Sequence, residues 1–442
     1  MRILSVGNRY PPWSVGGYET IWAAAVRALR AAGHPTLVLT TVPDPTDRAV
    51  TGVPDPTDRA VTGVPDPTDG PVCDVPEPTD GPVSGAPDPT DGPVSGAGPA
   101  DVRRQLSWYW HAHAFPRRSL RECIALERAN AEVLSACIRS WQPDAIMWWA
   151  MGGMSLSLLE QARRAGVPAL SVVGDDWPSY APRVDGWSRR WRGPVSARLA
   201  PVAERFTGLP ARLDLDAAAR WTFISAHVLA GARAAGWRLD DATVHHPGVD
   251  PARFARAPDQ PWRWRLLYCG RIDPRKGIAT AVRALSGLPA EATLTIDGDS
   301  DHAHAAELMA LAAELGVSDR VRFTVSDAED VPAAYAASDA VLFPVTWQEP
   351  WGLVPIEAMA VGRPVVATDA GGGPAEYLEP DRNCLQFPAG DAAGLAAAVR
   401  RLADDDALRD RLVQAGSVTA AGLGEAAFHG ALIDELEAVT AA

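Results

Sequence analysis

Short apolar runs alternate with segments of helical periodicity along most of the chain. This alternation predicts a parallel sheet wrapped by helices. The first predicted helix carries Ile21, Ala25, Ala28, Leu29 and Ala32 on one face and ends at Gly33, which suits a C-terminal cap. In the first half of the chain, the runs that read as strands are residues 2–7, 36–41, 145–150, 169–174 and 221–225.

The pattern restarts after a proline-rich stretch, residues 245–261. The strands predicted beyond it are residues 265–270, 292–298, 321–325, 340–344 and 364–369. We therefore predict an α/β protein with two facing, doubly wound, Rossmann-like domains, residues 1–250 and 262–424. Residues 425–442 are expected to form a helix that packs back on the N-terminal domain. Sheets of this kind bind ligands at the carboxyl ends of their strands, so the crevice between the domains is the expected site.

Residues 42–101 interrupt the first domain with an eleven-residue unit that occurs five times, starting at Val42, Val53, Val64, Val75 and Ala86. Each unit has a Pro-x-Pro, which removes backbone donors, and only one or two small apolar residues, so the repeat cannot bury a core. We expect a disordered, polyproline-like insert without catalytic residues. A regulatory or partner-binding segment is the alternative.

Composition narrows the class of protein. Hydrophobic residues make up 47% and charged residues 22% of 442 residues, which is typical of globular proteins. The net charge is -14, which disfavours a nucleic-acid partner, although the repeat supplies ten of these charges. No apolar run is long enough to span a bilayer and the start lacks a signal-peptide pattern, so we expect a cytoplasmic protein.

Cysteine and histidine spacing does not indicate a metal or disulfide site. The five cysteines are odd in number and include no C-x-x-C pair. The pairs His111/His113 and His302/His304 lack a third ligand at a recognisable spacing. We therefore expect no metal.

Two loops carry candidate anion-binding residues. Gly16 and Gly17 join the first strand to its helix, where free N–H groups attract anions, although a Gly-Gly here is more often a tight turn. Arg271 and Lys276 follow the first strand of the second domain, where two cations could converge on a diphosphate. A surface pair is the alternative for these cations.

Residues 346–376 are the most informative segment. Glu349 sits in a turn, residues 352–354 open a predicted helix with Pro355 in its first turn, and Glu357 follows about 7 Å further along the axis. A helix start with a carboxylate on either side suits a ligand that carries a diphosphate and hydroxyl-rich rings. Either glutamate alone is more often a solvated surface residue.

These motifs together resemble the retaining GT-B glycosyltransferases of family four. The resemblance covers nearly all of the chain outside the repeat, including residues 246–254, which are similar to that family's interdomain motif. The residues that carry it are Gly16-Gly17, Arg271, Lys276-Gly277, Glu349, Glu357, Ala358-Met359-Ala360, and Gly371-Gly372 with Glu376.

The resemblance implies the roles of the site residues. Arg271 and Lys276 would hold the diphosphate of a nucleotide-sugar donor, and Glu349 would contact the transferred sugar, so these three would be catalytic. Glu357 would bind the ribose. The remaining donor contacts would come from Gly16 and Gly17, from the backbone of Gly352, Leu353 and Val354, and from the stretch near Val325 and Ser326, where the base would lie. No metal and no cofactor are implied.

The acceptor side departs from the family. Gly174 stands where such enzymes often have a histidine, and Trp148-Trp149 stand where they often have a histidine-containing run. We expect Trp148, Trp149, Asp175 and Asp176 to line this side, with core packing as the alternative for each tryptophan. The acceptor would be a small molecule, a glycan or a lipid-linked molecule. Arginines mixed with aromatics at 103–121 and 187–192 suggest peripheral membrane contact.

Two other functions share the scaffold. A protein that binds a nucleotide sugar without transferring it is favoured by the absent histidine at position 174. A phosphorylase, an epimerase or an atypical coupling enzyme is the second alternative, but no pyridoxal-binding motif supports a phosphorylase.

Overall fold

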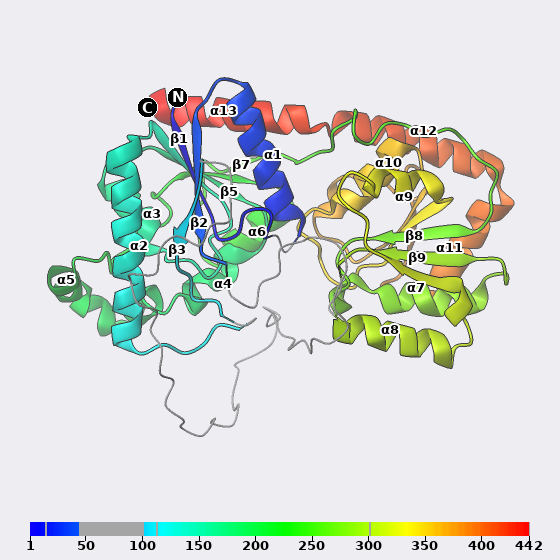
Figure 1. Ribbon diagram of the computed structural model, residues 1–442, viewed down its shortest axis with the longest axis horizontal. Helices are drawn as coiled ribbons and strands as arrows, with labels where there is room; N and C mark the ends of the chain where they lie inside the picture. Colours follow the sequence, from blue (N-terminus) through cyan, green and yellow to red (C-terminus); the bar gives the residue numbers. More distant parts are fainter. Residues whose placement is uncertain (14–15, 44–100, 112–113, 300–301, 442) are drawn as a thin grey trace.

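A computed structural model describes residues 1–13, 16–43, 101–111, 114–299 and 302–441. The described chain forms two lobes that lie side by side, each with a parallel sheet between helices (Figure 1). Apart from positions 42, 43 and 101, the repeat insert lies outside the described residues, and so does His113. Cys73 belongs to the insert, and the expectation made for the insert stays a prediction.

The N-terminal lobe has seven parallel strands in the order β3-β2-β1-β4-β5-β6-β7. Strand β1 lies between β2 and β4, and Ile3 pairs with Thr36 on one side and with Ala145 on the other. The strands are β1 (Ile3–Val6), β2 (Thr36–Thr41), β3 (Val102–Leu106), β4 (Ala145–Trp148), β5 (Ala169–Val173), β6 (Arg220–Phe223) and β7 (Thr243–Val244). The helices are α1 (Gly17–Ala31), α2 (Leu120–Trp141), α3 (Ser157–Arg164), α4 (Trp177–Val184), η1 (Ser188–Trp191), α5 (Ser196–Thr207) and α6 (Ala226–Ala234).

The C-terminal lobe repeats this topology with six parallel strands in the order β10-β9-β8-β11-β12-β13. The strands are β8 (Arg265–Cys269), β9 (Thr293–Asp297), β10 (Val321–Thr324), β11 (Ala340–Phe343), β12 (Val365–Thr368) and β13 (Leu385–Phe387). The α-helices are α7 (Ile278–Ala284), α8 (His302–Glu314), α9 (Val331–Ala337), α10 (Leu353–Val361), α11 (Ala392–Asp404), α12 (Asp406–Gly422) and α13 (Glu425–Ala441), and the short 3-10 turns are η2 (Pro274–Lys276), η3 (Leu285–Gly287), η4 (Ser318–Arg320) and η5 (Gly373–Glu376).

The strand order confirms the predicted doubly wound class and fixes where ligands can bind. In each lobe the order reverses beside the first strand, between β1 and β4 and between β8 and β11. Ligands of such sheets lie at this reversal, outside the carboxyl ends of the strands. The loops that follow β1 and β8 contain Gly16-Gly17 and Arg271 with Lys276, so both candidate loops start at these points.

All ten predicted strands are present, but β3, β7 and β13 were not predicted. All three are edge strands with weak patterns: β3 reads VRRQL and is mostly half-buried, β7 has two residues and β13 has three. The predicted face of α1 is partly wrong, because Ala32 is exposed while Trp22 and Val26 are buried. The predicted cap is confirmed, since Gly33 adopts φ +82 and its N–H donates to the Arg30 carbonyl at 3.0 Å.

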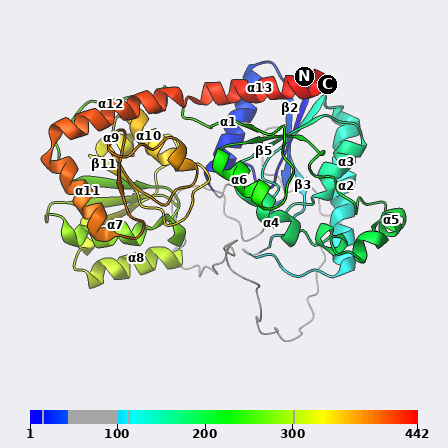
Figure 2. The ribbon, with the colours of Figure 1, turned by 180° about the vertical axis from the view of Figure 1, so that it is seen from behind.

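Helix α13 returns from the C-terminal lobe and lies along the N-terminal sheet (Figure 2). Phe428, Leu432 and Leu436 join the core formed by α1, β1, β4 and β5, and Glu435 accepts a hydrogen bond from His245 at 3.0 Å. Where the chain crosses, Val249 N–H donates to the Leu423 carbonyl at 3.0 Å, and a Cβ at Gly248 would lie 1.9 Å from that oxygen. The two crossings between the lobes therefore run side by side. Among the described residues, no helix has the length and apolarity needed to cross a bilayer.

Candidate active site

The loop after β1 meets the loop after β8 across the two lobes. Gly16 N–H donates to the Glu19 carboxylate at 2.9 Å, which caps the start of α1. A Cβ at Gly16 would lie 3.5 Å from Arg271 Nε, whereas one at Gly17 would meet nothing within 4 Å. Glu19 is buried, and its burial raises the pKa of its carboxyl, an effect that the nearby positive charges of Arg271 and Arg9 oppose. The two lobes thus approach each other at a glycine and a cation.

Two of the three cations in the loop after β8, Arg275 and Lys276, pair with different carboxylates. Asp273 pairs with Arg275 at 2.9 Å, and although burial opposes ionisation, this contact lowers the pKa of Asp273 to about 2. Lys276 Nζ instead lies 2.7 Å from Glu349 Oε2, with side chains that are 16% and 13% exposed. The structure therefore brings together two residues that are 73 positions apart, and it leaves the pair at the edge of solvent.

Trp347 completes the surroundings of this ion pair. Its Nε1 donates to the same Glu349 oxygen at 2.8 Å, and its ring lies 4.7 Å from the Arg275 guanidinium carbon and 5.7 Å from Lys276 Nζ. Sequence reasoning missed this residue. An aromatic two positions before Glu349 was the available signal.

The glycines at 371–373 fix the backbone of Glu349. Gly373 N–H donates to the Glu349 carbonyl at 2.8 Å. A Cβ at Gly372 would lie 2.5 Å from that oxygen, and Gly372 has φ +82, so a side chain is excluded by both space and conformation. The carboxylate is thus aimed by a segment over twenty residues further along the chain.

Helix α10 begins after Gly352 with no side chain capping it. The amides of its first turn are therefore available to an anion. Gly352 has φ +79, and its carbonyl accepts a hydrogen bond from the Tyr377 hydroxyl at 2.5 Å. Leu353 and Val354 begin the helix as predicted, and Pro355 lies in its first turn.

Glu357 lies on α10, where its Oε2 accepts a hydrogen bond from the Tyr335 hydroxyl at 2.6 Å. Burial raises the pKa of Glu357, while Tyr335 and the charge of Arg253 oppose the rise. Val325 follows β10 and is 47% exposed, and Ser326 N–H donates to Asp297 at 2.9 Å. Gly16 and Gly17 follow β1 in the N-terminal lobe, and the other predicted donor-side residues follow β8, β10 and β11 of the C-terminal lobe. Sequence reasoning missed Tyr335, for which no spacing signal existed.

One comparison with known proteins covers the C-terminal lobe. The family model for glycosyl transferases group 1 matches residues 255–418. The chain carries a group 1 glycosyl transferase domain. This domain contains Arg271, Lys276, Glu349 and Glu357.

Relatives and solved structures extend the likeness beyond that domain. The lipopolysaccharide core biosynthesis glycosyltransferase LpsE of Rhizobium meliloti is 34% identical over 174 residues, which are 39% of this chain and 48% of that protein. The chain thus spans about half the length of this relative. Glycogen synthase of Mycobacterium tuberculosis is 28% identical over 424 residues, covering 94% of this chain and 89% of that protein. The crystal structure of Anabaena Alr3699/HepE in complex with UDP and glucose has a TM-score of 0.64 at 18% identity and covers 99% of both chains. The fold is therefore the GT-B arrangement of two Rossmann-like domains.

Opposite the glycosyl transferase domain, the expectation for Trp148 and Trp149 is wrong. Both side chains are fully buried, and Trp149 stacks on Trp22 with ring centroids 6.0 Å apart. Neither ring can offer a face to an acceptor. Trp148 ends β4 and Trp149 follows it, and the two side chains join different buried clusters.

Asp175 and Asp176 follow β5 and are half-buried. Burial, with a contribution from Asp176, raises the pKa of Asp175 to about 8. The pKa of Arg275 is raised overall: burial lowers it, but the carboxylates of Asp273, Glu349 and Asp176 outweigh this effect. Asp176 therefore acts electrostatically on the glycosyl transferase domain from the opposite lobe.

The ring of Tyr18 leaves no room for a side chain at position 174, which is a glycine. A Cβ at Gly174 would lie 2.3 Å from the Tyr18 ring, whose hydroxyl donates to the Val172 carbonyl. The ring occupies the space into which a side chain at position 174 would extend. Sequence reasoning missed this, although Tyr18 directly follows Gly17.

Glu376 links the glycosyl transferase domain to the N-terminal lobe. Its carboxylate accepts hydrogen bonds from the N–H groups of Ala226 at 3.1 Å and His227 at 2.9 Å, at the start of α6. Nearby, the His246 and Trp351 rings stack with centroids 4.3 Å apart. The loop that holds Glu349 is thus tied to the opposite lobe.

Proposed function

We propose that this protein transfers a sugar from a nucleoside diphosphate sugar to a hydroxyl acceptor with retention of anomeric configuration and without a metal, as a member of family four. One observation carries the proposal. Lys276 and Glu349 form a 2.7 Å pair beside the uncapped start of α10, and Arg271 lies opposite Gly16 of the other lobe. Cations, amides and a carboxylate thus converge where the ends of both sheets meet.

Each group has a distinct task in this proposal. Arg271, Lys276 and the first amides of α10 bind the donor diphosphate and stabilise the charge that grows on it as the bond to the sugar breaks. Glu349 accepts hydrogen bonds from the sugar hydroxyls, and Glu357 accepts them from the ribose. The base lies against Val325 and Ser326. UDP, which HepE binds in its crystal structure, is the first nucleotide to test.

Retention follows when the acceptor attacks the face of the sugar that the diphosphate leaves. The acceptor oxygen forms the new bond to the anomeric carbon, the bond to the diphosphate oxygen breaks, and that oxygen takes the acceptor's proton. No strong base is needed, so positioning and charge stabilisation supply the catalysis. Asp175 and Asp176 line the acceptor side, where they accept hydrogen bonds from acceptor hydroxyls.

The test is to incubate the purified protein with nucleoside diphosphate sugars of known anomeric configuration and a panel of hydroxyl acceptors. NMR coupling constants of the product give its configuration, and a parallel reaction contains a chelator. We expect the donor's configuration in the product and an unchanged rate with the chelator. An inverted product or a reaction abolished by chelation contradicts the proposal. Donor binding without release of nucleoside diphosphate would instead favour a protein that only binds the sugar nucleotide.

A further inference from the structure

Helix α5 lies at the outer end of the N-terminal lobe (Figure 1). It presents an apolar stripe to solvent. Val195, just before the helix, and Leu199, Val202 and Phe206 within it are 72%, 55%, 50% and 79% exposed. Their spacing of four, three and four residues places them along one face of a helix. Four large apolar side chains in one row are more than the scattered apolar residues that an ordinary surface carries.

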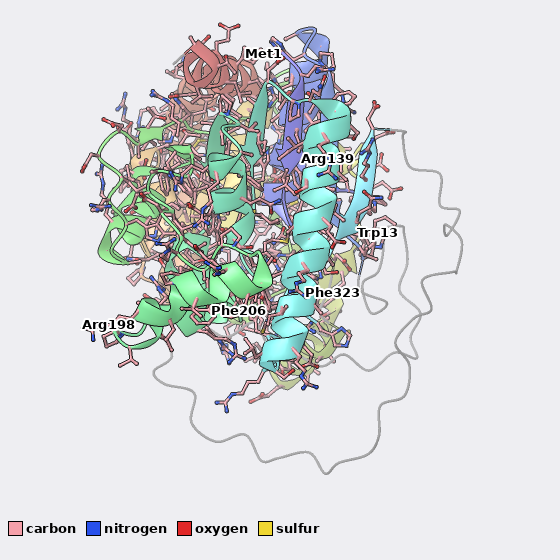
Figure 3. The ribbon with its side chains drawn as sticks, turned by 90° about the vertical axis from the view of Figure 1, so that its left-hand side faces the viewer. Met1, Trp13, Arg139, Arg198, Phe206 and Phe323 are labelled. Atoms are coloured by element: carbon pink, nitrogen blue, oxygen red, sulfur yellow. The ribbon has the colours of Figure 1, made fainter. Side chains whose placement is uncertain are left out.

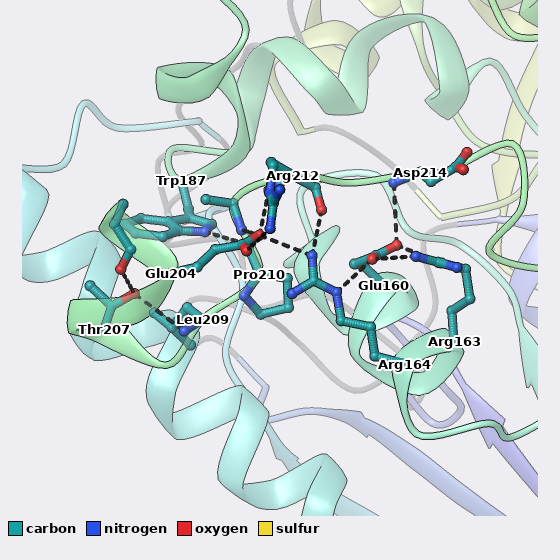
Figure 4. A network of polar contacts seen from close by, with 12 residues as sticks. Glu160, Arg163, Arg164, Trp187, Glu204, Thr207, Leu209, Pro210, Arg212 and Asp214 are labelled. Carbon is teal, nitrogen blue, oxygen red and sulfur yellow. Dashed lines mark hydrogen bonds and ion pairs between the residues drawn. The ribbon is translucent and has the colours of Figure 1, made fainter. Parts of the chain in front are cut away.

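The opposite face of α5 is fixed to the protein. Ala200 is buried in a cluster with Trp187. Glu204 is held by Arg164 at 2.9 Å and by Arg212 at 2.8 Å (Figure 4). Burial opposes ionisation of Glu204, yet these contacts lower its pKa to about 2. The stripe therefore belongs to an anchored helix.

Arginines surround the stripe. Residues 186–212 contain six arginines and one acidic residue, the paired Glu204, in a chain whose net charge is -14. Arg192, Arg198 and Arg205 are exposed. Figure 3 shows Arg198 and Phe206 on α5 at this end of the lobe. A helix with an apolar row flanked by arginines has the composition of helices that lie in the plane of a membrane surface.

We propose that α5 docks this protein on an anionic lipid bilayer. Leu199, Val202 and Phe206 insert at the boundary of the acyl chains, while Arg192, Arg198 and Arg205 contact lipid phosphates. The local positive charge complements an anionic surface and is opposite in sign to the rest of the chain. The patch is carried by one protruding helix, which suits a flat partner. The proposal does not depend on the sugar chemistry, because docking needs no donor.

The experiment is cosedimentation of the full chain with vesicles of phosphatidylcholine alone or mixed with phosphatidylglycerol. We expect binding to the mixed vesicles only, weakened by added salt. The double variant Arg198→Gln/Arg205→Gln should bind about 25-fold more weakly, at about fivefold for each arginine. Leu199→Ser/Phe206→Ser should lose about tenfold for each side chain.

Val418→Ser is the matched control, because Val418 is 70% exposed on α12 in the other lobe. It should bind vesicles like the wild type. Circular dichroism and the melting temperature verify that each variant is folded. Wild-type protein that stays in the supernatant with anionic vesicles overturns the proposal, as does undiminished binding by the Leu199/Phe206 variant. Self-association that this variant abolishes, without any vesicle binding, would assign the stripe to a second copy of the chain and would also overturn it.

Discussion

Replacing Lys276 by alanine removes the cation that Glu349 contacts at 2.7 Å. Two unit charges about 4 Å apart interact by about 4 kcal/mol at the effective dielectric constant of a partly exposed site. A phosphate oxygen at the same distance would gain a similar amount as its charge grows. Loss of one such donor typically costs about 10² to 10³ in turnover. We therefore expect Lys276→Ala to lower kcat by about 10² to 10³.

The assay is steady-state release of nucleoside diphosphate, with the melting temperature as the test of folding. Glu349 keeps its hydrogen bond from Trp347, so we expect Lys276→Ala to remain folded. Arg283→Ala, which removes an exposed cation on α7, is the control and should keep the wild-type rate. Turnover by Lys276→Ala equal to that of the wild type would refute the reasoning. If the variant melts early, Lys276→Arg separates loss of charge from loss of packing, since it keeps the charge.

Three further outcomes follow from the geometry. Gly372→Ala should destabilise the fold by about 1 to 3 kcal/mol in urea titrations. The control Gly390→Ala should cost less, because Gly390 has a similar φ of +80 but a Cβ there would meet no atom within 4 Å. Equal losses of stability would exclude a clash with the Glu349 carbonyl as the cause. Tyr335→Phe should weaken nucleoside diphosphate binding in calorimetry about fivefold with little change in kcat, because Glu357 loses one hydrogen bond. An unchanged Kd for the nucleoside diphosphate would argue against Glu357 as a donor contact. The pKa of Asp175 rises from 3.8 to about 8 on folding, so between these pH values the folded state holds a proton that the unfolded state releases. The free energy of unfolding should therefore fall as the pH rises from about 4 to about 8. Asp175→Asn should flatten this fall, whereas the exposed control Asp319→Asn should not.

The sequence predicted most of the fold because the central strands of both sheets are continuous apolar runs. Such runs are the strongest signal of a buried parallel strand. Three of the four edge strands were missed, because β3 is rich in arginine, β7 has two residues and β13 has only three. The donor-side candidates could be located from the sequence because their motifs lie directly after predicted strands, and their contact with a donor stays a prediction.

The acceptor side could not be predicted in the same way. Trp148 and Trp149 have the composition of a ligand-binding face, and only the tertiary packing shows that both are buried. Tyr18 fills the space above Gly174 from another element, and Tyr335 reaches Glu357 from a helix that sequence spacing does not connect to it. Contacts of this kind depend on how the helices pack on the sheet, and the sequence pattern of a single segment does not determine that packing.

The shared topology explains why the site depends on both lobes. Each sheet directs its first loop outward at the point where strand order reverses, so Gly16 and Arg271 meet where the lobes face each other. Glu376 binds the start of α6 with the same segment whose glycines fix Glu349. Glu349 and Arg271 both belong to the C-terminal lobe, so a movement of one lobe against the other would shift them together relative to Gly16. Because Gly16 and Arg271 lie on opposite lobes, a separation of the lobes would part these two residues.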